Sequence, residues 1–139
     1  MKKQRSDDRG AASVELALLT PMLIAFALLM ILAGRVVGAG SIADEAAHAA
    51  ARAASLERSV PAAEAGATDI AARSLAASGL ICSDHILALD HGGLRPGGTV
   101  TAVLDCRVGL DDLSGLGVPG SVTIQGSSTV AVDTFRGQP

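Results

Sequence analysis

The stretch that decides the fold is LALLTPMLIAFALLMILAG, residues 16–34, which contains no charged side chain. Counted from Ala11, the largely apolar run covers 24 residues and would form a helix about 36 Å long, whereas the hydrocarbon core of a bilayer is about 30 Å thick. The alternative is a buried helix of a soluble domain. A chain of 139 residues with only two aromatic residues has little material to cover such a helix on all sides. The sequence therefore predicts a transmembrane helix over residues 11–34.

Basic residues precede this span and predict its orientation. Residues 1–10 form a short leader with four of them, namely Lys2, Lys3, Arg5 and Arg9, whereas only Arg35 follows the span closely. Because basic segments stay in the cytoplasm, we expect a cytoplasmic N-terminus, a single pass through the plasma membrane and an extracytoplasmic remainder. The formal net charge of −3 and the absence of Trp and Tyr argue against nucleic acid as a partner.

Residues 35–78 are predicted to form an Ala-rich helical extension. Eight of the twelve residues from Ala43 to Ala54 are alanine, the best helix former. One face carries a stripe of small side chains, namely Ala43, Ala47, Ala50 and Ala54. Such a stripe either lets another helix approach closely or belongs to a solvated helix, in which His48 is also expected to be solvated.

A second helix is predicted after Ser59. Ser59 is suited to the N-cap and Pro61 to the first turn. The helix would run to about Ser78, where Gly79 is placed to end it.

Residues 79–139 predict a small β-rich domain, because apolar residues there alternate with period two. The strand 99–108 places Val100, Ala102, Leu104, Cys106 and Val108 on one face, and the strand 121–133 does the same with Val122, Ile124, Val130 and Val132. A weaker strand is expected at 86–89, followed by a turn at 91–98, and Asp111 with Asp112 is expected in a loop. The predicted fold class is therefore α+β: a long N-terminal transmembrane helix with an Ala-rich extension, a second helix and an antiparallel sheet of about three strands.

Two cysteines, Cys82 and Cys106, lie on the expected extracytoplasmic side. A disulfide between them is permitted in that compartment and is the favoured interpretation. The alternative is a zinc site that also uses His85 and His91, although the spacing of the cysteines is unlike that of paired zinc ligands. We therefore predict no metal and no cofactor.

The segment RGAASVE, residues 9–15, joins the charged leader to the apolar run. It has a glycine at the junction and a carboxylate, Glu15, at the fifth position after that glycine. A charge within a membrane span is costly and by default suggests a function. The alternative is that Glu15 lies at headgroup level and only complements the positive end of the helix dipole.

This segment resembles the processing site of type IV pilin-like precursors. Residues 10–23, GAASVELALLTPML, narrow the resemblance to TadE-type proteins, the minor pilins or pseudopilins of the tight-adherence pilus system. The resemblance implies that a prepilin peptidase cuts after Gly10, that Ala11 becomes the new N-terminus and that Glu15 is the assembly carboxylate. It also implies other pilin-like subunits and assembly-platform proteins as partners, in a pilus or a related secretion apparatus.

Two features inside the helical part are open to several interpretations. Pro21 removes one donor and frees the carbonyl of Ala17, so the helix is a candidate for a kink unless Thr20 or a neighbouring helix compensates. Val37-Gly38-Ala39 could instead be the cleavage site of a classical signal peptide, which would release a secreted protein that begins at Gly40.

No enzyme constellation is visible: the sequence has no phosphate-binding glycine loop, no nucleophile elbow and no His-Glu metal motif. A membrane-anchored binding domain remains a third alternative, but it requires a pocket with convergent polar groups.

Overall fold

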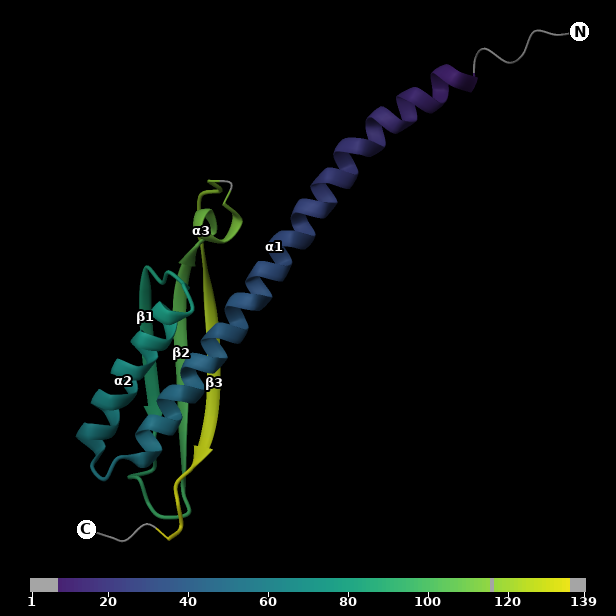
Figure 1. Ribbon diagram of the computed structural model, residues 1–139. Helices are drawn as coiled ribbons and strands as arrows, with labels where there is room; N and C mark the ends of the chain where they lie inside the picture. Colours follow the sequence, from purple (N-terminus) through teal and green to yellow (C-terminus); the bar gives the residue numbers. More distant parts are fainter. Residues whose placement is uncertain (1–7, 116, 136–139) are drawn as a thin grey trace, which may run out of the picture. The chain divides into compact units, whose positions relative to one another are not determined.

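The computed structural model describes residues 8–115 and 117–135, with side chains described from Val14 onward. It contains helices α1 (Asp8–Leu56), α2 (Val60–Ala77) and α3 (Leu110–Ser114) and strands β1 (Asp84–Asp90), β2 (Thr99–Gly109) and β3 (Ser121–Ala131) (Figure 1). The predicted α+β class is confirmed: a long apolar N-terminal helix, a second helix and a three-stranded antiparallel sheet. Lys2, Lys3 and Arg5 of the leader lie outside the described residues. The chain divides into two compact units at the Gly34–Arg35 bond, and each is described by itself.

The first unit contains the apolar part of α1. Twelve large hydrophobic side chains between Val14 and Ile31 are 46–71% exposed, and no described residue of this unit covers them. Within the described part of the chain, α1 is the one helix long and apolar enough to cross a membrane. Burying such a surface is favourable by roughly 25 cal/mol per Å² of apolar area, so its exposure to water is costly.

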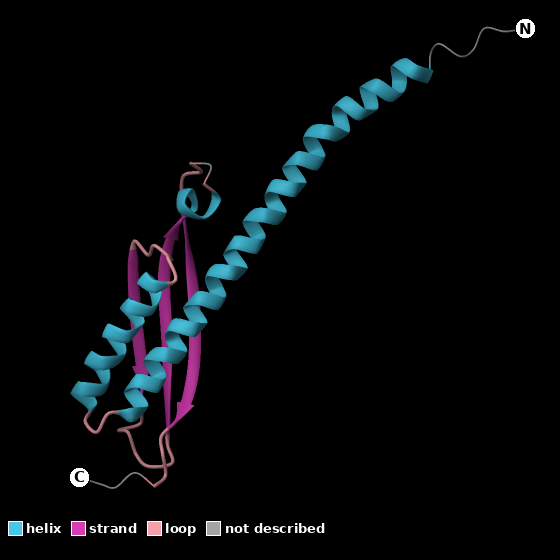
Figure 2. Ribbon diagram, in the orientation of Figure 1, coloured by secondary structure: helices cyan, strands magenta, loops and turns pink. Residues whose placement is uncertain are grey.

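In the second unit, the last part of α1 packs with α2 through alanines. The stripe predicted on α1 is completely buried, and so are Ala63, Ala67 and Ala71 of α2. Apart from Ala43, these alanines belong to one hydrophobic core with residues of β2. Both helices lie on the same face of the sheet (Figure 2). The interpretation of the stripe as a surface for close approach is therefore right, and the solvated alternative is wrong.

The sheet has the strand order β1-β2-β3 with antiparallel pairs throughout. The central strand confirms the predicted alternation, because its five predicted inward residues, Val100, Ala102, Leu104, Cys106 and Val108, are at most 1% exposed. On β3, Ile124 is buried and Val122 is half-buried, while Val132 is buried just beyond the end of the strand. The weak strand expected at 86–89 is present as β1, which is longer than predicted.

Helix α2 begins and ends close to the predicted residues. Ser59 occupies the N-cap position with extended backbone angles, but its side chain makes no capping hydrogen bond. At the other end, Gly79 has a φ of +72° and its N–H donates to the carbonyl of Ala76 at 3.3 Å, while the Leu80 N–H donates to that of Leu75 at 3.3 Å. These two bonds form a Schellman motif, which requires a left-handed residue at Gly79.

The Gly79→Ala variant is expected to lose about 1 kcal/mol of unfolding free energy, because a Cβ disfavours the left-handed conformation. Gly66→Ala is its matched control on the same helix. Gly66 is in the helix interior, where an added Cβ would make only an ordinary contact with the Glu57 carboxylate at 4.0 Å, so alanine there should stabilise by up to about 1 kcal/mol. Urea unfolding of the full chain in detergent, followed by circular dichroism, measures both. A loss of stability in both variants, or in neither, would contradict the assignment of the helix end.

One expectation about the connection between β2 and β3 is wrong. Asp111 and Asp112 do not lie in an irregular loop but in the first turn of the five-residue helix α3. The helix ends at Gly115, which has a φ of +64° and donates its N–H to the Asp111 carbonyl at 2.9 Å. Both carboxylates suit the positive end of a helix, but so short an element has no periodic pattern to read from sequence.

Candidate functional site

The candidate processing segment lies at the beginning of α1. Helix α1 starts at Asp8, so Gly10 and Ala11 belong to its first turn. The first four N–H groups of a helix have no intrahelical partner.

Glu15 follows on the same helix, four residues after Ala11, so both lie on one face and are separated by about 6 Å along the axis. The Glu15 side chain is exposed. None of the other described side chains forms an ion pair or hydrogen bond with its carboxylate. The carboxylate lies next to a surface of exposed apolar side chains such as Val14 and Leu18.

Pro21 lies inside α1, and the helix continues through it. The hydroxyl of Thr20 donates to the carbonyl of Leu16 at 2.7 Å. Thr20 therefore does not compensate at Ala17, the carbonyl that loses its donor to Pro21. A kink at Pro21 stays a prediction.

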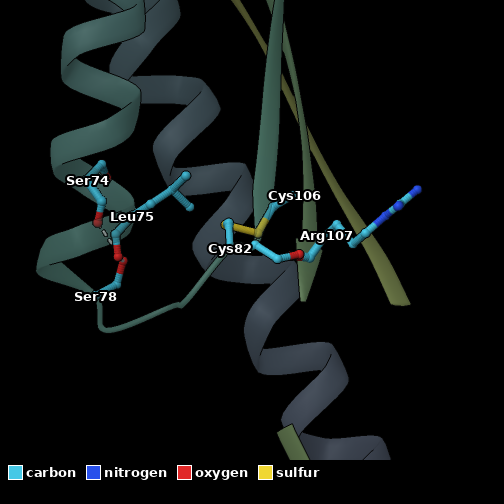
Figure 3. The surroundings of a disulfide bond; sticks show 7 residues. Ser74, Leu75, Ser78, Cys82, Cys106 and Arg107 are labelled. Carbon is cyan, nitrogen blue, oxygen red and sulfur yellow. Dashed lines mark hydrogen bonds between the residues drawn. A yellow bond between two sulfur atoms is a disulfide. The ribbon is translucent and has the colours of Figure 1, made fainter. Parts of the chain in front are cut away.

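The two cysteines are bonded to each other (Figure 3). The Cα atoms of Cys82 and Cys106 are 5.5 Å apart. Next to this disulfide, the backbone N–H and the hydroxyl of Ser83 both donate to the carbonyl of Arg107, at 2.8 and 3.0 Å. Together these bonds hold the segment after α2 against β2. Neither sulfur is available as a thiolate ligand for zinc, and within the described residues no three His, Cys, Asp or Glu side chains gather in a metal-binding group.

A junction between α1 and β3 is a structural site that sequence reasoning missed. At Gly126 the strand meets the backbone of α1 at Ala43 and Asp44 so closely that a Cβ would overlap it. The Ser127 N–H donates to the Asp44 carboxylate at 3.0 Å, and Nδ1 of His48 lies 3.0 Å from Oγ of Ser128. His48 is therefore hydrogen-bonded rather than simply solvated. A glycine inside an alternating strand is the signal that could have predicted this approach.

Comparison with known proteins finds a family model that covers several of these features. A family model described as TadE-like protein matches residues 10–52. The match begins at Gly10 and includes Glu15, Pro21 and the Ala-rich part of α1 that packs in the second unit. No curated protein and no solved structure matches the chain.

Proposed function

We propose that this chain, whose residues 10–52 match the TadE-like family model, is a pilin-like, single-pass membrane protein. Its proposed role is to contribute to assembly of a tight-adherence pilus or a related secretion apparatus, together with other pilin-like subunits and assembly-platform proteins. The observation that carries the proposal is the family match from Gly10 through Glu15 into an apolar helix that its own chain leaves uncovered.

The uncovered helix supports the membrane part of the proposal. Large apolar side chains surround α1 from Val14 to Ile31, and a lipid bilayer or a bundle of like helices would bury them. The basic leader would stay in the cytoplasm, so residues from Arg35 onward would be extracytoplasmic, where a disulfide persists.

The processing part of the proposal gives Gly10, Ala11 and Glu15 their roles. A prepilin peptidase would cut after Gly10 and expose a positive α-amine on Ala11. Side chains on a helix lean towards its N-terminus, so the Glu15 carboxylate is shifted from its own Cα towards the level of that amine. A neighbouring subunit at nearly the same height could therefore pair its amine with Glu15, in a medium of low dielectric constant where an ion pair is strong.

The secreted alternative is less well supported. Cleavage after Ala39 would cut α1 next to residues that belong to the folded second unit. Ala39 is 4% exposed, and the Arg35 guanidinium donates to the carbonyl of Leu113 at 3.0 Å. Alkaline carbonate extraction separates the two cases, because a pilin-like chain stays with the membrane and a secreted chain does not.

In cells with an active prepilin peptidase, intact mass measurement is expected to find Ala11 as the N-terminus. The Gly10→Val variant should retain the leader and keep all 139 residues. Gly34→Ala is the matched control, since it alters another glycine of α1 with open space around it and should be processed normally. An unprocessed chain without any substitution would contradict the processing proposal.

A further inference from the structure

The second unit contains a groove at the end where α1 enters it. Its volume is about 380 Å³, within the range of small-molecule sites. Gly38 and Ile42 of α1 line one side, and Ile81, after α2, lines another. Arg35, Asp112 and Leu113 also line it. We call this the Arg35 groove.

Two residues of the Arg35 groove follow the apolar run directly in the sequence. Arg35 is the first charged residue after residues 16–34, and Gly38 follows within one helical turn, about 5 Å further along the axis. If residues 16–34 span the membrane, the groove residues Arg35 and Gly38 follow the span directly along the chain. Ile81, which lines the groove, is 65% exposed.

The groove combines apolar walls with one cationic and one anionic side chain. The Arg35 guanidinium donates one N–H to the Leu113 carbonyl. Its other N–H groups are suited to binding a phosphate. The Asp112 carboxylate is exposed on the first turn of α3 and suits an ammonium group. An amphiphile with an apolar chain, a phosphate and an ammonium group matches all three features.

We propose that the Arg35 groove binds a phospholipid with an ammonium headgroup, such as phosphatidylethanolamine, from the leaflet that α1 leaves. Its phosphate contacts Arg35, its ammonium faces Asp112 and part of one acyl chain lies against Ile42 and Ile81. The inference rests on the proposed function only in requiring that α1 spans the membrane.

Single tryptophans test this inference, because the chain contains neither Trp nor Tyr. The full chain is reconstituted in phosphatidylethanolamine-containing vesicles whose acyl chains are brominated near the headgroup. Ile81→Trp reports on the groove and Phe26→Trp on the span. Leu56→Trp, at a residue 70% exposed at the other end of α1, reports on a surface outside the groove. We expect fluorescence loss for Ile81→Trp comparable to that for Phe26→Trp, and little for Leu56→Trp.

A second pair of variants distinguishes the groove from general surface contact. Gly38 lines the groove and Gly40 does not, and both have open space around them on the same helix. Adding Gly38→Leu to the Ile81→Trp chain should fill the groove and reduce the quenching, whereas Gly40→Leu should leave it unchanged.

Two results would overturn the inference but leave the membrane span intact. In the first, Phe26→Trp is quenched and Ile81→Trp is not. In the second, Ile81→Trp is quenched and adding Gly38→Leu does not reduce that quenching. A lack of quenching at Phe26→Trp would instead reject the span itself, and with it both proposals.

Discussion

The Gly126→Ala variant is expected to destabilise the second unit by about 3 kcal/mol, because it forces an extra carbon against a packed backbone. An added Cβ would overlap the backbone carbonyl group of Ala43 and the amide nitrogen of Asp44. Backbone atoms in the middle of a helix cannot move aside as the end of a flexible side chain can. Relief would require α1 to separate from β3, which would also break the bond from the Ser127 N–H to Asp44.

Urea unfolding of the full chain in detergent, followed by circular dichroism, measures this effect. Ser127→Ala is the matched control, because its side chain is exposed on the same strand and its N–H remains available to Asp44. The control should change the unfolding free energy by no more than about 0.5 kcal/mol. Equal stability of Gly126→Ala and the control would show that α1 and β3 do not approach as closely as the structure has them.

The second large effect is expected at Glu15. The Glu15→Gln variant should lower incorporation into the assembled apparatus by about a hundredfold, because it leaves a neighbour's α-amine without its partner in an apolar setting. Stranding one member of a buried ion pair costs at least about 3 kcal/mol, and each 1.4 kcal/mol is a factor of about ten. The quantity to measure is the amount of subunit that copurifies with other pilin-like subunits.

Glu45→Gln is the matched control for this experiment. It makes the same chemical change at an exposed glutamate of the same helix, in the second unit. Intact mass should show that both variants are cleaved after Gly10, so that assembly is compared between chains with the same N-terminus. Normal assembly of Glu15→Gln would remove the pairing role of the carboxylate, while the match of residues 10–52 to the TadE-like family model would stand.

Much of the fold follows from local pattern. The 19 uncharged residues before Arg35 determine an apolar helix by their length and composition. Alternation on β2 identifies its buried face because side chains on a strand point to opposite sides in turn. Gly79 identifies the end of α2 because few other residues adopt a left-handed conformation. The candidate processing segment is equally local, since Gly10, Ala11 and Glu15 are read from one short stretch.

The sequence by itself therefore determined the two long helices, the three strands and the TadE-like segment, but not the short helix α3. The tertiary structure alone decided what covers the faces of those elements. The alanines of α1 could have been solvated or buried, and only the positions of α2 and the sheet show that they are buried. Contacts between residues far apart in the chain, such as Gly126 with Ala43 or Arg35 with Leu113, depend on how the elements pack in three dimensions. Local periodicity carries no information about that packing.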